Sequence, residues 1–182
     1  NWKANGAGSA NTDGSINSTV SVNQTAGFSI VSWTGTGANA SIGHGLNAQP
    51  KWIFLKCRTQ GDKWIVYNDT VANSKYLILN ENQSPTTSST HFNNTSPTNA
   101  VFYTGTSGNV SGTGEDFIAY CFADVPGYTK SGTVNGNGAA DGPFIYTGFA
   151  PSFVLYKRNG VGDWYFVDNK RPGYNDNDKR LY

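Results

Sequence analysis

An internal repeat, offset by about one hundred residues, constrains this 182-residue chain more than any single motif. The stretch GFSIVSWTGTGANASIGHGLNAQPKWIFLKCRTQGDKWIVYND, which begins at Gly27, returns from Gly127 as GYTKSGTVNGNGAADGPFIYTGFAPSFVLYKRNGVGDWYFVDN. Positions kept by both copies are expected to support the scaffold, whereas positions that differ can carry a specific task. The kept pairs are Gly27 and Gly127, Gly35 and Gly136, Gly37 and Gly138, Pro50 and Pro151, Lys56 and Lys157, Asp62 and Asp163, and Trp64 and Trp164.

The apolar residues occur in short runs that are rich in β-branched and aromatic types. Examples are SIVSW at 29–33, WIFLK at 52–56, WIVY at 64–67 and FVLY at 153–156. Clusters of Gly, Asn, Ser, Thr and Pro, such as TGTGANAS and NGNGAADG, separate them and supply turns. No window shows the apolar spacing of an amphipathic helix. The pattern therefore predicts an all-β fold, a β-sandwich or jelly roll built from two internally repeated β units.

The repeat also predicts the domain organisation. Residues 1–26 contain few large apolar groups and are expected to form an N-terminal arm or linker, in which TVSVNQ alternates like an edge strand. Residues 27–182 are expected to form the duplicated domain, with repeat 1 over about 27–120 and repeat 2 from about 127. Trp64 and Trp164 are expected to be paired core anchors. Residues 70–120 have no second copy, and the chain has no Met, so we expect it to be a piece of a longer polypeptide that truncates repeat 2.

Charge and hydropathy exclude two classes of partner. Only 14% of residues are charged and the net charge is +1, so no field attracts nucleic acid. No apolar run approaches the roughly 20 residues that span a bilayer, and the N-terminus lacks the pattern of a signal peptide. We expect neither nucleic acid binding nor membrane insertion.

Cysteine, histidine and acidic residues indicate no cofactor or metal. Cys57 and Cys121 lie in strand-like runs without counterparts in the other copy, so we expect buried free thiols, with a disulfide as the less favoured alternative. His44 and His91 are isolated and lack zinc-ligand spacing. The acidic segments NTDGS and YNDND are rich in oxygen ligands but do not have the spacing of a calcium loop.

Catalytic patterns are equally weak. Asp62 and Asp163 resemble a glycosidase couple only in being repeated, and a hairpin turn explains both because Asp bonds the local backbone there. His44 has no nearby nucleophile signature and is expected to be a turn or packing histidine. The Gly-rich segments lack the GK[ST] ending of a phosphate loop. The sequence therefore predicts a non-enzymatic protein.

Aromatic residues are the most suggestive remaining feature. The chain has five Trp, ten Tyr and ten Phe, and exposed aromatic rings flanked by amides are suited to sugar rings. The residues without an aromatic counterpart in the other copy are candidates for a ligand-binding surface: Trp33, Tyr76, Phe92 and Tyr103. The alternative, that they fill the sandwich core or a subunit contact, remains open.

Four sequence segments together resemble those of a known family. They are NTDGSINSTVSVNQTAGFSIVSWTGTG, IGHGLNAQPKWIFLK, DFIAYCFADVPGYTKSGTVNGNGAADGPFIYTGFAPSFVLYKR and GDWYFVDNKRPGYN. Nearly the whole chain is similar to a domain of unknown function in tail-fibre, tail-spike and other virion structural proteins of marine and cyanobacterial tailed phages. The resemblance brings no catalytic residues.

The resemblance implies a location and partners. It implies a virion surface, hence extracellular, protein that contributes to host attachment by binding a host-surface glycan, and whose partners are other virion proteins. By analogy with such appendages we expect a homo-oligomer, with a trimer as the common form. The alternative is an architectural capsid or fibre decoration or cement module that binds only virion chains. Glycan depolymerisation is disfavoured because no carboxylate pair stands out.

Overall fold

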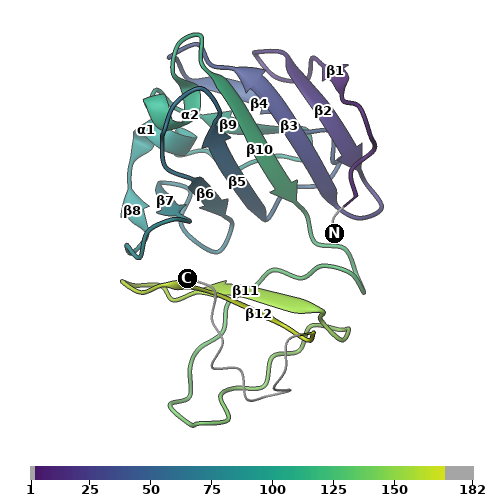
Figure 1. Ribbon diagram of the computed structural model, residues 1–182, viewed down its shortest axis with the longest axis vertical. Helices are drawn as coiled ribbons and strands as arrows, with labels where there is room; N and C mark the ends of the chain where they lie inside the picture. Colours follow the sequence, from purple (N-terminus) through teal and green to yellow (C-terminus); the bar gives the residue numbers. More distant parts are fainter. Residues whose placement is uncertain (1–2, 171–182) are drawn as a thin grey trace.

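The computed structural model describes residues 3–170 and is almost entirely β, which confirms the predicted fold class. Its main feature is an antiparallel sheet of eight strands (Figure 1). In spatial order these are β1 (Ser9–Asn11), β2 (Ser18–Asn23), β3 (Phe28–Thr34), β10 (Asp116–Phe122), β5 (Trp52–Cys57), β6 (Ile65–Asn68), β7 (Lys75–Ile78) and β8 (Thr86–Thr87).

A second layer covers one face of this sheet. It contains the antiparallel pair β4 (Ala40–Gly43) and β9 (Val101–Thr104), which lie behind the large sheet in Figure 1. Two one-turn helices, α1 (Ser89–Phe92) and α2 (Gly108–Ser111), flank the pair. The arrangement is sandwich-like, with one large sheet and one small one.

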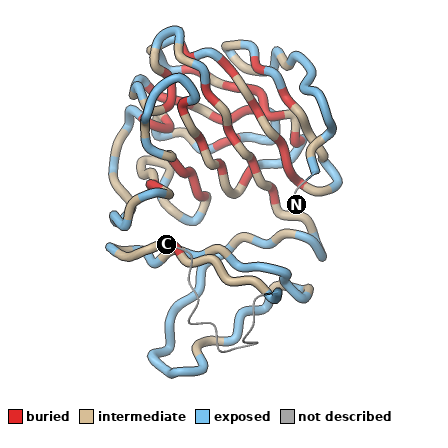
Figure 2. The backbone as a smooth tube through the Cα atoms, viewed as in Figure 1, coloured by how far each residue is buried: buried red, intermediate tan, exposed pale blue. Residues whose placement is uncertain are grey.

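The core lies between these layers. Along β3, β5 and β10 buried residues alternate with partly exposed ones, as expected for strands with one face on a core. Buried segments are concentrated in residues 9–125, whereas the C-terminal part of the described chain is mostly exposed or intermediate (Figure 2). The inward residues of the three strands are Val31, Trp33, Ile53, Leu55, Cys57, Phe117, Ala119 and Cys121.

The N-terminal segment differs from the predicted arm or linker. β1 and β2 form one end of the large sheet, and β2 pairs with β3 from Thr19↔Ser32 to Asn23↔Phe28. Val20 is buried in the main core. The alternation of TVSVNQ correctly predicted a strand, but β1 makes it the second strand rather than the edge. Because its inward side chains complete the core, this segment is part of the domain.

The second copy of the repeat forms only a hairpin in the described residues. Its strands β11 (Phe153–Lys157) and β12 (Trp164–Asp168) pair in the register of β5 and β6, since Phe153↔Asp168 matches Trp52↔Asn68. The counterparts of β3 and β4, residues 128–135 and 141–144, are not strands. The predicted equivalence of the two halves is therefore limited to the hairpins.

Pairing partners explain this difference. β5 and β6 pair with each other locally, and so do their copies. β3 and β4 instead pair with β10 and β9, which come from the segment without a second copy. Without those partners the copied strand sequences have no ladder to join.

Candidate functional site

Two of the four predicted ligand-binding residues lie in the core. Trp33 is 5% exposed, and its ring lies 5.5 Å from the Phe117 ring and 5.4 Å from the Phe102 ring. Phe92, 2% exposed, makes an edge contact with Tyr67. The prediction that these two rings form a recognition surface was wrong. Trp33 lacks an aromatic counterpart because the second copy, in the described residues, builds no core there, and Phe92 lies in the segment that has no second copy.

The other two candidates, Tyr76 and Tyr103, lie on strands of different sheets. Tyr76 is partly exposed in β7, and its ring stacks on the imidazole of His91 with the centroids 3.7 Å apart. Tyr103 is partly exposed in β9, at an outward position between two buried residues. Since Trp33 and Phe92 are inaccessible, the four residues do not form one exposed site.

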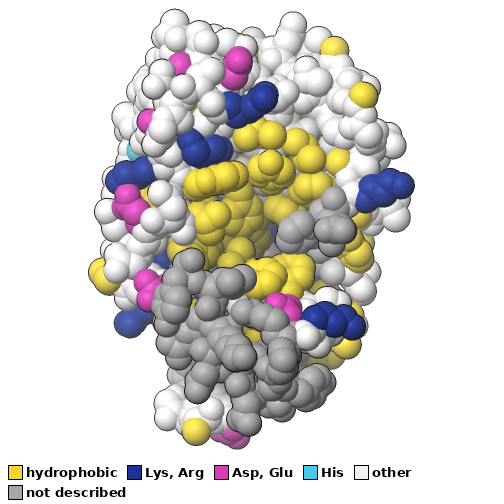
Figure 3. All heavy atoms as spheres, in the orientation of Figure 1, with side chains coloured by type: hydrophobic (Ala, Val, Ile, Leu, Met, Phe, Trp, Pro, Cys, Tyr) yellow, Lys and Arg dark blue, Asp and Glu magenta, His cyan; other side chains and the backbone are white. Residues whose placement is uncertain are grey.

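The aromatic surface of the molecule is instead the outer face of the large sheet, away from β4 and β9. Figure 3 shows hydrophobic side chains gathered in the middle of this face. All its members are partly exposed and lie at positions that alternate with the core residues. We call this set the outer aromatic face: Ile30, Phe54, Trp64, Ile118, Tyr120 and Phe122.

Rings on this face are packed side by side across the strands. Trp64 stacks near Tyr120, with centroids 6.3 Å apart and an angle of 26° between the rings. Phe54 meets Phe122 edge-on at 5.9 Å. Tyr120 pairs with Ile30 of β3 on one side and with Phe54 of β5 on the other. Three adjacent strands therefore present one continuous apolar surface.

The hairpin β11–β12 docks on one end of this face, because Phe54 packs against the cluster that contains Trp164. Trp164, 8% exposed, meets the Trp52 ring edge-on at 6.0 Å, and its indole N–H donates to the Ile78 carbonyl at 2.8 Å. Leu155 packs in the same cluster, with Val66 and Leu77. Trp164 is therefore an anchor, as predicted. Trp64 is not its partner, because Trp64 is only partly buried and lies near Tyr120.

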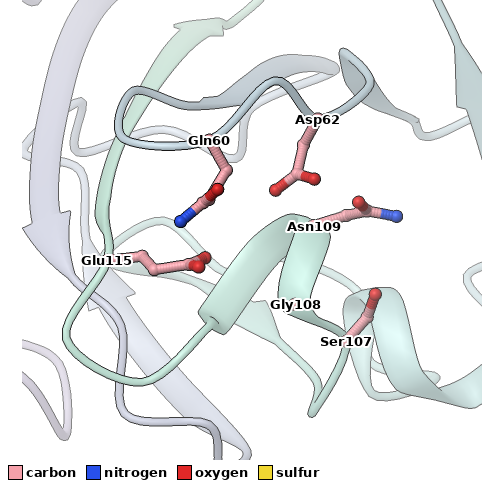
Figure 4. A pocket seen from close by; sticks show the side chains of 6 residues that line it. All are labelled: Gln60, Asp62, Ser107, Gly108, Asn109 and Glu115. Carbon is pink, nitrogen blue, oxygen red and sulfur yellow. The ribbon is translucent and has the colours of Figure 1, made fainter.

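A polar pocket of about 440 Å³ contrasts with this apolar surface (Figure 4). Asp62 and Gln60, from the connection between β5 and β6, point toward α2, and Glu115 reaches in from the residue before β10. Its lining consists of Gln60, Asp62, Ser107, Gly108, Asn109 and Glu115.

Two carboxylates and a thiol converge at this pocket. One ligand atom from each of Cys57, Asp62 and Glu115 lies within 4.8 Å of the other two. The Cys57 thiol is buried and donates to Glu115 Oε2 at 3.6 Å. Chemically, the set offers cation ligands and a carboxylate pair about as close as that of a retaining glycosidase. None of the described residues that line it has an aromatic ring to hold a sugar.

Sequence reasoning missed this juxtaposition. Asp62 is a repeated residue and was assigned to a turn, where it does lie, but Glu115 comes from a distant part of the chain. They meet because β10 is inserted between β3 and β5. No local spacing in the sequence signals that pairing.

The two histidines are packing residues. Both ring nitrogens of His44 are engaged: Leu46 N donates to Nδ1 at 3.2 Å, so Nε2 donates to the Thr98 carbonyl at 3.2 Å. Burial lowers the pKa of His44 and lowers the pKa of His91 to about 4. Both are therefore neutral near pH 7, and the expectation for His44 is confirmed.

Neither cysteine forms a disulfide, which confirms the prediction of free buried thiols. Burial raises the pKa of Cys121 to about 12. Such a thiol stays protonated and is a poor nucleophile. In residues 3–170 no helix has the length and apolar character needed to cross a membrane.

Comparison with known proteins gives a family without an assigned function. Residues 1–182 match a family described as a domain of unknown function (DUF7483), and the chain belongs to it. No curated protein and no solved structure matches the chain. The site must therefore be interpreted from the geometry.

Proposed function

We propose that this chain is a non-enzymatic domain of a phage virion surface protein, from a tail fibre or spike, and that it works by holding other virion chains. The virion context rests on the sequence resemblance described above. The binding mode rests on the placement of apolar surface. This choice favours the architectural alternative over glycan binding through Trp33 and Phe92, which are buried in the core.

The observation that carries the proposal is the outer aromatic face. Monomeric soluble proteins rarely expose large contiguous apolar patches, and such patches commonly mark sites of protein contact. Here β5, β10 and the residue before β6 contribute partly exposed rings, and Ile30 of β3 extends the apolar surface beside them. The hairpin β11–β12 already covers one end of this face, where Trp52 and Phe54 pack against the cluster of Trp164, so the face accepts β structure.

Host attachment through a glycan is the second candidate, and the same rings favour it. Trp64 and Tyr120 are partly exposed aromatic residues, the type that stacks on sugar rings. Lys56 projects from β5 on this side of the sheet and provides a polar neighbour. A glycan site on this face would use different residues from those predicted.

The two candidates are separated by one pair of variants. Ile118→Lys places a charge in the middle of the face, and Trp64→Ala removes one stacking ring. If the domain holds virion chains, Ile118→Lys should reduce binding to purified structural proteins of the parent virion by about tenfold or more. The control Asn99→Lys adds the same charge at an exposed position in the connection before β9 and should leave binding unchanged.

A glycan array distinguishes the second candidate. If attachment is the function, the chain should bind host-derived glycans and Trp64→Ala should lose that binding. Blank arrays for both proteins would reject the glycan candidate. Equal binding of virion chains by Ile118→Lys and by the unaltered chain would reject the assembly role. Release of oligosaccharides from host polysaccharide would contradict the non-enzymatic assignment.

A further inference from the structure

The segment 144–156 combines high exposure with a complete absence of charge. Its sequence, FIYTGFAPSFVLY, contains no Asp, Glu, Lys, Arg or His. Phe144 is 90% exposed and Tyr146 81%, and Ile145, Val154 and Tyr156 are exposed to between 41% and 54%. Large side chains this exposed are usually covered when the protein is assembled.

Two residues of this exposed segment correspond, through the repeat, to core residues of the first copy. Val154 and Tyr156 correspond to Ile53 and Leu55 of β5, because Lys157 corresponds to Lys56. Ile53 and Leu55 are both 0% exposed, in the main core beneath β4 and β9. Val154 and Tyr156 lie on the hairpin face opposite Leu155, which packs with Trp164 against the first copy. The hairpin face that corresponds to the buried face of β5 is therefore exposed to solvent.

We infer that this segment is a self-association surface, and that its occupant is the same segment of a second copy of this chain. A contact between identical uncharged segments brings no like charges together and needs no complementary charge on the partner. A two-fold contact would also place each exposed ring against another ring, an arrangement that aromatic side chains favour.

The exposed area is sufficient for a weak specific contact. At roughly 200 Å² for each aromatic side chain, Phe144, Tyr146 and Tyr156 expose on the order of 400 Å² per copy, to which Ile145 and Val154 add. Both copies together then cover on the order of 1,000 Å², the lower limit for specific interfaces. We therefore expect dimerisation that depends on concentration in the micromolar range.

This inference deepens the proposed assembly function and rests on it, but it uses a different surface. The outer aromatic face lies on the large sheet, whereas residues 144–156 lie in and before the second hairpin. Variants of one surface should leave the other intact. The two proposals can therefore fail separately.

The test is sedimentation velocity on the 182-residue chain from micromolar to millimolar concentration. We expect a monomer–dimer equilibrium that Tyr156→Lys and Phe144→Lys each weaken by about tenfold or more. The matched control is Val161→Lys, which adds the same charge at a position that is 64% exposed in the β11–β12 connection, outside the segment. It should leave the equilibrium unchanged.

Each outcome decides the inference. Urea unfolding separates lost contact from lost folding: Phe144→Lys and Val161→Lys, at exposed positions, should keep native stability, whereas Tyr156→Lys also loses the stacking of Tyr156 on Tyr165 at 4.9 Å. A chain that stays monomeric at every concentration overturns the inference, as does an equal effect of Val161→Lys. If the monomeric chain still binds virion proteins, and Ile118→Lys still prevents that binding, the assembly function stands without self-association.

Discussion

The hairpins β5–β6 and β11–β12 share a sequence pattern and a pairing register but have opposite surroundings. β5 lies between β6 and β10 in the large sheet, with its inward side chains in the main core. β11 pairs with β12, and Val154 and Tyr156 are exposed. The comparison separates what the local sequence determines, which is the hairpin, from what distant strands determine, which is the core.

A lysine that both copies retain shows how the local sequence determines the hairpin. Lys56 Nζ donates to the Gln60 carbonyl at 3.1 Å, and Lys157 Nζ donates to the Gly160 carbonyl at 2.9 Å. The same side chain thus closes the same connection in both copies, despite the one-residue difference in length. Its retention reflects turn geometry rather than binding or catalysis.

The largest expected effect contrasts the two copies at one position. Leu55→Ala should destabilise the chain by about 2–5 kcal/mol, because it opens a cavity at a fully buried site. Tyr156→Ala, the matched change in the second copy, should cost about 1 kcal/mol, because that side chain is exposed and loses only its stacking on Tyr165, 4.9 Å away. Urea unfolding followed by circular dichroism measures both. Comparable losses at the two positions would show that the second hairpin also has a core in solution.

The sequence predicted the parts of this fold that depend on short-range pattern. Alternation indicated the all-β class and the strand character of residues 18–23, and the repeat indicated the hairpin β11–β12. Neither signal indicated the insertion of β10 between β3 and β5, which depends on strand pairing over 82 residues, from Thr34 to Asp116.

The candidate site was less predictable for the same reason. Aromatic residues were selected by what the second copy lacked, and that criterion identified core rings such as Trp33. The rings on the outer face, Trp64 and Tyr120, are distinguished from core rings only by which side of a strand they occupy. That assignment requires the register of β10 against β5, which brings Tyr120 beside Phe54. Neither the residue type nor the local spacing indicates which side of the strand these rings occupy.

A second test uses two kept glycines. Gly27 and Gly127 both have positive φ, 61° and 76°, so alanine is strained at either position. A Cβ on Gly27 would also lie 2.7 Å from Val125 Cγ2 and 2.8 Å from the Ala123 carbonyl oxygen, whereas a Cβ on Gly127 meets nothing within 4 Å. Gly27→Ala should therefore cost about 2–3 kcal/mol, from strain plus overpacking.

Gly127→Ala supplies the matched control for that experiment. It should cost about 1 kcal/mol, the backbone contribution alone. The two midpoints of urea unfolding, measured under identical conditions, give the difference. If the Gly127→Ala variant lost as much stability as Gly27→Ala, the second turn would have to be packed as tightly as the first.

A third expected effect is a pH dependence confined to the first region, which contains both histidines. In the unfolded chain His91 has the ordinary pKa of 6.5, and in the folded chain burial lowers this pKa to about 4. Between these values the unfolded state binds a proton that the folded state does not. Stability from this group is therefore complete above pH 6.5 and is lost progressively as the pH falls toward 4, by up to about 3 kcal/mol.

The variant His91→Gln isolates this contribution, because carboxylates titrate in the same acidic range in both proteins. The difference in unfolding free energy between the unaltered chain and His91→Gln should change as the pH falls from 6.5 to 4, in the direction that favours the variant. A difference that stays constant across that range would mean that His91 is protonated in the folded state. Since β11–β12 contains no histidine, undocking of the hairpin alone, followed by amide exchange, should not show this pH dependence. A hairpin whose opening followed the His91 titration would be coupled to the core of residues 9–125, and the independence of the two regions would fail.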